Sequence, residues 1–311
     1  TQNVYGVKEL TMLVDNQEVF HSYLDRFSLN DTRYLNAWVD YETWRNKRSF
    51  YTKTFVEPGN KLQFIRSKNR GYVNIQEERP YDVTFVLKDV YGNANRISMK
   101  VQGKEQMIPS FKTDSTSFFQ WYTENRFGAK GMRLLIPRSS LYNDLYFRYD
   151  TEQSDRYLSD IHILHDAPVP LHQKAQLSIY LSQDSLVNKS QYGIISIRNK
   201  RLSWVGGTYR DGWIDGKISE LGNRYAIAVD TVPPKITPVE SNKWVEKKMI
   251  AFKINDNLSG VQWYRGEIDV QYVLFEMDGK KALIWYTFDP ERLPRGKHML
   301  SLTVTDACGN Q

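Results

Sequence analysis

Hydrophobic and polar residues alternate in short runs along most of the chain. Residues 82–88, 132–136, 216–218, 224–229 and 300–305 are predicted strands of this kind, and turn-forming residues such as Gly, Pro, Asn, Asp and Ser separate them from their neighbours. Alternation with period two places one face of a strand against a core. Aromatic residues, which favour pleated surfaces, make up 14% of the sequence. The pattern predicts an all-β protein.

One pattern of strand and turn occurs twice. Both copies end in Asp-x-x-Gly-Asn, as Asp89, Gly92 and Asn93 and again as Asp306, Gly309 and Asn310. In such a turn Asp caps backbone N–H groups, while Gly and Asn accept positive φ. A second match lies upstream of each copy, running from Gly6 to Asp15 and Val19 and from Gly260 to Asp269 and Val273. The two ends of the chain are therefore predicted to carry the same domain type.

The repeat and the length together predict three tandem β-sandwich domains. A chain of 311 residues is long for one hydrophobic core. We place an immunoglobulin-like sandwich at residues 1–103, a second β-sandwich of different pattern at 104–231, and a small immunoglobulin-like sandwich at 232–311. Pro233 and Pro234 mark the last boundary because they stop a strand and stiffen a linker. The first copy has no equivalent of the strands before Gly260, so we expect its opening strand to lie upstream.

The first copy also contains an insert, at about residues 25–59. From Gly6 to Gly92 is 86 residues, whereas Gly260 to Gly309 is 49, so the first copy is longer by 37 residues. The insert has capping residues at 30–32, followed by aromatic residues at helical spacing, Tyr34, Trp38 and Tyr41. We expect a short helix lying on the sandwich, followed by further strands that include residues 72–76.

Charge and cysteine content narrow the function classes. Basic minus acidic residues give 15 − 12, 16 − 14 and 11 − 10 for the three segments, so the net charge of +6 is spread thinly. A nucleic-acid partner is not expected, because such proteins gather Lys and Arg on one face. Cys308 is the only cysteine, which excludes an intrachain disulfide and a cysteine-based metal site. No apolar run reaches 18 residues, so no membrane span is predicted.

The sequence holds no recognisable catalytic motif. His162, His165 and His172 are expected at the surface or in turns, since a strand sends His162 and His165 to opposite faces. His21 and Asp25 have the His-x-x-x-Asp spacing of lysostaphin-type zinc endopeptidases, but no His-x-His occurs in the chain. Motifs for nucleophilic serine, phosphate loops and dinucleotides are missing as well. We predict that this chain is not itself an enzyme.

Two groups of residues are candidates for binding. The Asp-rich turns at Asp89, Asp256 and Asp306 could ligate calcium between domains, but capping of their own turns is the simpler explanation, and no cofactor is expected. The turn residues predicted to be structural are Asp89, Gly92, Asn93, Asp256, Gly260, Asp306, Gly309 and Asn310. Trp38, Tyr41, Trp44, Trp121 and Tyr122 could form a ligand surface for sugars, but packing in a core or between domains is the favoured explanation.

Six segments resemble the region after the peptidase domain in large lysostaphin-type (LytM-like) zinc metallopeptidase proteins of Gram-negative bacteria. They are YGVKEL at 5–10, DTRYLN at 31–36, EPGN at 57–60, DVYGN at 89–93, DTVPP at 230–234 and DNLSG at 256–260. The resemblance covers nearly the whole chain. It implies an exported protein, with an upstream zinc domain that cuts peptidoglycan cross-bridges and with immunoglobulin-like accessory domains. None of that family's zinc ligands has a match here beyond the spacing of His21 and Asp25.

The expected function follows from this resemblance and from the missing motifs. We expect a non-catalytic accessory region of an exported cell-wall peptidase, located in the periplasm or at the cell surface. It would position the upstream peptidase domain, or bind peptidoglycan or a partner protein. The alternative is a carbohydrate-binding or adhesion module of the cell envelope without a peptidase partner.

Overall fold

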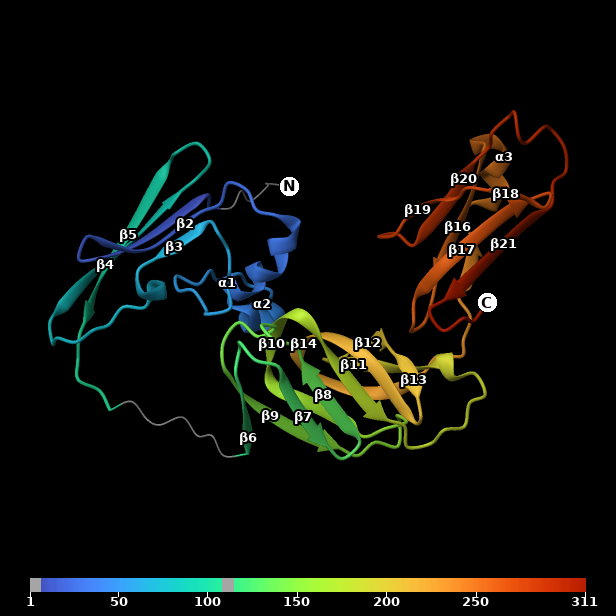
Figure 1. Ribbon diagram of the computed structural model, residues 1–311. Helices are drawn as coiled ribbons and strands as arrows, with labels where there is room; N and C mark the ends of the chain where they lie inside the picture. The colour runs from blue at the N-terminus through green and yellow to red at the C-terminus, as the bar shows by residue number, and fades with distance from the viewer. Residues whose placement is uncertain (1–6, 108–114) are drawn as a thin grey trace.

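The computed structural model describes residues 7–107 and 115–311 and confirms the all-β prediction. About 50% of the residues lie in strands and about 10% in helices. The antiparallel sheets form three groups along the chain, within residues 9–102, 116–229 and 235–306. We call these groups, with their connecting loops, the first, middle and third domains (Figure 1).

The first domain contains one five-stranded sheet in the order β3-β2-β1-β4-β5. Its strands are β1 (Glu9–Val14), β2 (Gln17–Tyr23), β3 (Ile65–Ser67), β4 (Pro80–Lys88) and β5 (Ala94–Gln102). The alternation buries Met12, Val14 and Phe20 on one face. The strand predicted over residues 72–76 is wrong, because this segment has no strand partner and Tyr72 instead packs its ring against Phe55.

The predicted helical insert is confirmed and lies between the first sheet and the middle domain (Figure 1). It forms η1 (Leu29–Tyr34), α1 (Leu35–Trp38) and α2 (Tyr41–Lys47), and η2 (Asn69–Gly71) follows β3. Ser28 caps η1, two residues before the predicted capping run, and Asp40 caps α2 by accepting a hydrogen bond from the Thr43 N–H at 3.1 Å. Arg48, in the left-handed region, ends α2.

The middle domain is built around two long antiparallel strands, β10 (Ile161–Tyr180) and β14 (Trp213–Val229). The main sheet has the order β12-β11-β14-β10-β8-β7, with β13 on β14, β9 on β10 and β6 on β9. The other elements are β6 (Thr116–Phe119), β7 (Asn125–Ala129), β8 (Met132–Ile136), β9 (Leu145–Glu152), η3 (Lys189–Gln191), β11 (Tyr192–Arg198), β12 (Arg201–Gly206) and β13 (Thr208–Arg210). Its core contains the fully buried Leu164, Leu177 and Ile194.

The third domain is a small sandwich of two sheets, ordered β15-β16-β20-β19 and β18-β17-β21. Its strands are β15 (Lys235–Pro238), β16 (Met249–Asn255), β17 (Val261–Ile268), β18 (Gln271–Val273), β19 (Glu276–Asp278), β20 (Leu283–Thr287) and β21 (Leu300–Asp306), with η4 (Ser241–Lys243) and α3 (Trp244–Lys247). Phe252 and Ile284 from one sheet and Val304 from the other belong to the same core cluster.

The sequence repeat corresponds to a shared three-stranded unit, although Gly6 itself lies outside the described residues. The unit is β2-β1-β4 in the first domain and β18-β17-β21 in the third. The hairpin turns match as well: Asp15 exchanges backbone and carboxylate hydrogen bonds with Asp82, and Asp269 does the same with Met299, all at 2.9 Å. Among the described residues, the first domain has no counterpart of the sheet formed by β15, β16, β19 and β20.

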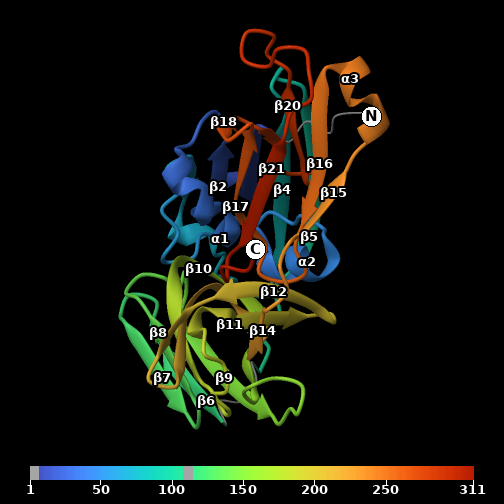
Figure 2. The same ribbon diagram turned by 90° about the vertical axis from the view of Figure 1, so that its right-hand side faces the viewer.

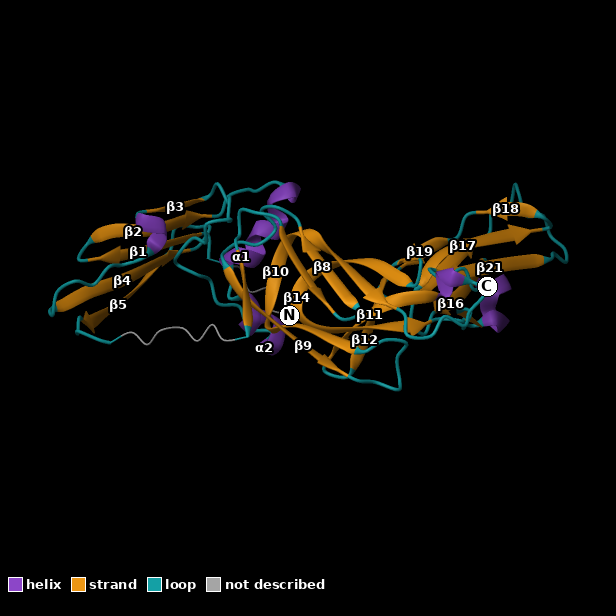
Figure 3. Cartoon of the chain, turned by 60° about the horizontal axis from the view of Figure 1, so that its bottom comes forward, coloured by secondary structure: helices purple, strands orange, loops and turns teal. Residues whose placement is uncertain are grey.

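The three domains are arranged in a row with the middle domain at the centre. Figure 1 shows the first and third domains rising from the same side of the middle domain, with space between them. Figure 2 shows both domains above the middle domain after a rotation of 90°. The view in Figure 3 separates all three domains along one line. The molecule therefore has two junctions, and each joins an outer domain to the middle one.

Candidate metal centre

The two copies of the Asp-x-x-Gly-Asn turn form the same hydrogen bonds. Asp89 Oδ1 accepts from the N–H groups of Tyr91 and Asn93 at 2.8 and 3.0 Å. Asp306 Oδ1 accepts from those of Cys308 and Asn310, both at 2.8 Å. In each copy the Asn side chain donates to the other carboxylate oxygen at 2.7 Å, and the glycine has φ of +87° or +84°. The structure thus places these predicted residues in capped turns.

The copies differ in what surrounds them. Asp89 lies at the end of the β4–β5 hairpin, and the three residues that follow it are exposed. The Asp306 turn instead meets the middle domain, where the Ser190 hydroxyl donates to the Cys308 carbonyl at 2.9 Å and the Gln191 amide donates to Asn310 Oδ1 at 2.7 Å. Asp306 is only 2% exposed as a result.

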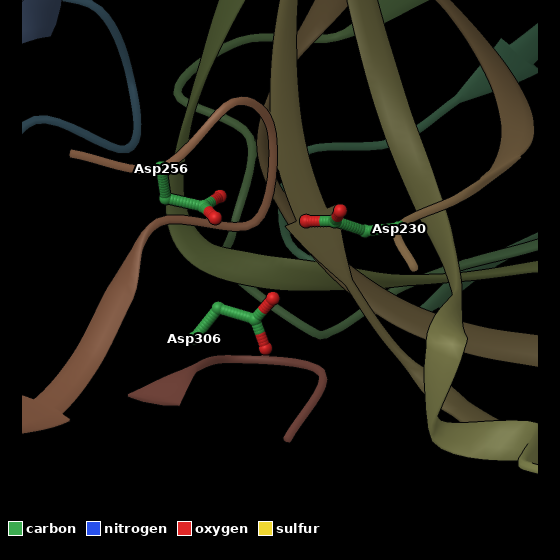
Figure 4. Close-up of side chains that lie close together, drawn as sticks. All are labelled: Asp230, Asp256 and Asp306. Atoms are coloured by element: carbon green, nitrogen blue, oxygen red, sulfur yellow. The ribbon is translucent and has the colours of Figure 1, made fainter. Parts of the chain in front are cut away.

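Three aspartates meet at this junction between the middle and third domains. Asp230 directly follows β14, Asp256 directly follows β16, and Asp306 ends β21. One carboxylate oxygen from each lies within 4.8 Å of the other two. Figure 4 shows the three carboxylates turned toward a common space. Asp230 is 1% exposed, so the cluster is largely shielded from water.

Backbone groups hold each carboxylate in place. Asp256 Oδ2 accepts from the N–H groups of Leu258 and Gly260, at 2.9 and 2.8 Å. Asp230 Oδ2 accepts from the Ser259 N–H at 2.8 Å, and this bond crosses the junction. Asp256 Oδ1, in contrast, is a buried oxygen without a hydrogen-bond partner. Such an oxygen is costly unless something else coordinates it.

The charge of the cluster is uncompensated within the described residues, since none of their ion pairs includes Asp230, Asp256 or Asp306. Two unit charges no more than 4.8 Å apart repel by at least about 3 kcal/mol at an effective dielectric constant of about 20. A bound cation would relieve this repulsion between the three carboxylates.

The donor set is typical of a hard divalent cation. All three side chains offer carboxylate oxygens, which calcium binds at about 2.3–2.6 Å, so that two oxygens on opposite sides of the ion are about 4.6–5.2 Å apart. The three oxygens lie within 4.8 Å of one another, which is close enough for one such ion to contact all three. Magnesium prefers near-ideal octahedral geometry with bonds of about 2.0–2.1 Å and gives up its water reluctantly, so a site made of protein carboxylates suits calcium better. Burial, with added effects of the three aspartates, raises the pKa of the adjacent Cys308 to about 11, so it is a neutral thiol and a poor ligand.

The junction between the first and middle domains is built differently. Glu220 on β14 is 7% exposed. Its Oε2 accepts from the Tyr41 hydroxyl at 2.6 Å and from Arg45 Nε at 2.8 Å, and its Oε1 pairs with the other arm of the Arg45 guanidinium. Arg198 and Asn223 of the middle domain complete the network. Burial raises the pKa of Glu220, but the hydrogen bonds from Arg45 and Tyr41 outweigh it and keep that pKa below the usual value.

A second set of contacts strengthens this first junction. The ring of Tyr34 stacks on His172 at 4.1 Å between centroids, and the Tyr142 hydroxyl donates to the Arg33 carbonyl at 2.6 Å. The Gly59 N–H donates to the Tyr142 carbonyl at 2.8 Å. A Cβ atom at Gly59 would come within 2.9 Å of the Tyr142 backbone, so only glycine allows this approach. The insert therefore connects the first domain to the middle domain through several direct contacts.

The predicted aromatic surfaces are only partly exposed. Trp38, Tyr41 and Trp44 are half-buried: Trp38 packs on Phe64, Trp44 packs on Tyr41, and Tyr41 binds Glu220. Trp121 is half-buried beside Tyr122, which is 45% exposed. The structure does not bring the two groups into one site. Their predicted role in binding stays a prediction.

The histidines do not form a metal site. His162 was expected near the surface, but it is 1% exposed and its Nδ1 lies 2.8 Å from the Tyr149 hydroxyl. Burial lowers the pKa of His162. The expectation failed because His162 lies on the same face of β10 as the buried Leu164, so its side chain points into the core.

Asp230 and Glu220 are the two important residues that the sequence pattern did not single out. Asp230 precedes the proline pair of a linker, and Glu220 is one acidic residue among many in a β-rich segment. The position of Asp230, directly after a strand and three residues before a Pro-Pro pair, is the one local signal that could have indicated it.

Comparison with known proteins finds a similarity for one part of the chain. The family model described as a Zu5-like domain matches residues 116–230. The match runs from the first residue of β6 to Asp230 of the carboxylate cluster. No curated protein and no solved structure matches the chain. No helix within the described residues has the length and apolar character needed to cross a membrane.

Proposed function

We propose that this chain, with its Zu5-like middle domain, is a non-catalytic positioning region of an exported cell-envelope protein. Calcium bound by Asp230, Asp256 and Asp306 fixes the orientation of the third domain. The observation that carries the proposal is the convergence of three carboxylates from two domains, with a buried Asp256 oxygen that lacks a partner.

The two junctions support a positioning role. Each joins its domains through specific polar contacts between buried or half-buried residues, such as Glu220 with Arg45 and Asp230 with Ser259. Contacts of this kind specify one relative orientation, whereas a plain flexible linker leaves many. A region with two such junctions can hold a neighbouring domain at a defined distance and angle.

A calcium-dependent junction suits an exported protein. Calcium sites of extracellular modules typically have dissociation constants of about 10⁻⁴–10⁻³ M, which match the calcium supply outside the cytosol. The resemblance to the region after lysostaphin-type peptidase domains adds a partner and a location to the proposal. In that form, the region positions an upstream zinc peptidase domain on peptidoglycan in the periplasm or at the cell surface.

Isothermal titration calorimetry tests the calcium site. We expect one calcium ion to bind per chain and magnesium to bind more weakly. Asp306→Asn keeps an oxygen acceptor for the turn but removes a charge, so it should abolish calcium binding. Asp89→Asn, the same change in the matching turn of the first domain, is the control and should leave binding intact. Equal calcium binding by the Asp306→Asn protein would overturn the metal site.

Retention on purified peptidoglycan at low and high salt separates the positioning role from the alternative function. The positioning proposal predicts calcium-dependent orientation of the domains whether or not the chain is retained. The alternative, a carbohydrate-binding or adhesion module, requires retention, and its absence at every salt concentration would leave only the positioning role.

A further inference from the structure

A cavity of about 690 Å³ opens on the outer face of the middle domain, over β7, β8, β10, β13 and β14. Its lining shares no residue with either junction. The side chains that matter for its chemistry are Arg126, Arg133, Ser178, Arg210, Trp213 and Asp215. The volume falls within the range of about 300–1,000 Å³ that is usual for ligand sites.

Strand register explains how the sequence forms this cavity. Ser178 pairs with Arg133 on one side and with Asp215 on the other, while Arg133 also pairs with Gly128. These residues therefore form one row across the sheet, on the face opposite the core residues Leu177 and Ile179. Gly128 has open space above it, since a Cβ atom there would meet nothing within 4 Å. The surface of the sheet is therefore recessed at Gly128, where no side chain fills the space.

One arginine in the cavity has a free guanidinium group. Arg126 pairs with Glu124 at 2.7 Å, and Arg210 lies 3.7 Å from Asp215. Arg133 has no ion-pair partner among the described residues, and its guanidinium carbon lies 4.0 Å from the centroid of the Trp213 ring. A planar cation held on an aromatic ring is oriented for two parallel hydrogen bonds to a carboxylate.

Polar and apolar groups next to Arg133 add a second kind of recognition. The Ser178 hydroxyl donates to Asp215 Oδ1 at 2.5 Å, and both side chains line the cavity. Carboxylate and hydroxyl groups together can donate to and accept from the hydroxyls of a sugar. Tyr180, which is 50% exposed, packs edge-on against Trp213 and extends the aromatic surface beside them.

We infer that this cavity binds a saccharide that carries a carboxylate group. The inference rests on the proposed envelope role and names the chemistry that the middle domain would recognise there. The carboxylate would bind Arg133, and sugar hydroxyls would bind Asp215 and Ser178. A nucleic acid fits poorly, because Asp211 and Asp215 offset two of the three lining arginines. A peptide could not add as a strand, since the cavity lies across the paired face of the sheet.

Two disaccharides that differ in one carboxylate test this inference. Isothermal titration calorimetry compares N-acetylglucosaminyl-N-acetylmuramic acid with the neutral di-N-acetylchitobiose, which lacks the lactyl carboxylate. We expect the first to bind about tenfold more tightly, the effect of one charged hydrogen-bonded contact. Arg133→Gln should remove this preference, and Trp213→Ala should weaken binding of both sugars.

Arg201→Gln is the matched control, because Arg201 is an exposed arginine on β12 outside the cavity. Far-ultraviolet circular dichroism and thermal unfolding establish that each variant folds. Absence of binding at about 10 mM sugar, equal affinity for the two sugars, or an unchanged preference in the Arg133→Gln protein would each overturn the inference. Calcium binding and retention on peptidoglycan are measured separately, so the proposed function can stand when the cavity inference fails.

Discussion

The first and third domains share a three-stranded unit but join the middle domain by opposite electrostatic means. At the first junction, Arg45 from the helical insert neutralises the buried Glu220. At the second junction, three aspartates meet without a basic partner among the described residues. The same turn motif that remains open at Asp89 supplies a buried carboxylate at Asp306. The comparison shows that a repeated unit gains a new role from what it docks against.

The difference has a consequence for how each junction depends on the ions in solution. At the first junction, the Arg45 guanidinium neutralises the Glu220 carboxylate. This junction should therefore close near neutral pH whatever ions are in solution. With the calcium site that we propose, the second junction takes its cation from solution, so its closure should follow the calcium concentration. Two backbone amides report on the junctions separately: the Gly59 N–H crosses the first, and the Ser259 N–H crosses the second. Hydrogen–deuterium exchange can measure both amides in one experiment.

The largest expected effect is at the first junction. Arg45→Met leaves Glu220 buried beside a more distant Arg198, and loss of one partner of a buried ion pair costs about 3 kcal/mol. Protection of the Gly59 amide should then fall by about two orders of magnitude, while that of Ser259 stays unchanged. The double variant Arg45→Met, Glu220→Gln should recover most of the loss. Equal loss at both amides would contradict the independence of the junctions.

Calcium should act only at the second junction. With a dissociation constant of about 10⁻⁴–10⁻³ M, about 5 mM calcium stabilises the bound state by about 1–2 kcal/mol. Exchange at Ser259 should slow by roughly sixfold to fiftyfold relative to a chelator, and exchange at Gly59 should not change. In chelator, Asp306→Asn should protect Ser259 better than the natural residue, because it removes repulsion. The same protein should show no response to calcium.

Acid should open the first junction of the natural protein at a higher pH than the same junction in a protein with a neutral residue at position 220. The pKa of Glu220 is lowered in the folded protein, so its ion pair contributes stability above the usual value of 4.5. That contribution is lost as the pH falls through the lowered pKa. Protection at Gly59, corrected for intrinsic exchange, should decline below pH 4.5 by about tenfold at most for each pH unit. The Glu220→Gln protein should lack this decline.

The smallest expected effect is a difference in pH dependence between the matching hairpins of the first and third domains. Asp15 pairs with Arg79, while Asp269 pairs with His298, whose Nδ1 lies 2.6 Å from Oδ2. This hydrogen bond raises the pKa of His298 above 6.5, so its contribution is complete below pH 6.5 and is lost as the pH rises through the raised value. Titration of the His298 ring by nuclear magnetic resonance should give a midpoint above 6.5, which Asp269→Asn lowers.

Local patterns predicted much of the fold because strands and turns are encoded locally. Alternation indicated residues 132–136 as a strand, and Asp-x-x-Gly-Asn indicated the turns. Residues 216–218 and 224–229 were predicted as separate strands, but both belong to β14. Gly222, with φ of +84°, lies so close to the Ala167 carbonyl that a Cβ atom would clash at 2.3 Å. The glycine therefore allows close packing inside one strand, where the sequence suggested a break.

The candidate site was only partly predictable. Asp256 and Asp306 were identified because the residues that directly follow each of them form a recognisable turn motif. Asp230 and Glu220 gain their roles from partners that lie far away in the sequence, at Ser259 and Arg45. The distance between domains depends on packing of whole sheets, which no local pattern specifies. The sequence therefore indicated calcium as one option, and the structure supplied the third carboxylate.

The continuity of β14 with Asp230 determines how the chain would respond to mechanical tension. A pull on the third domain reaches the middle domain through the residue that directly follows this strand. The force then acts along β14, whose ladder with β10 joins eleven residue pairs. Because these hydrogen bonds lie across the direction of pull, they share the force and must break together rather than one by one. The middle domain would therefore outlast both of its junctions under stretch.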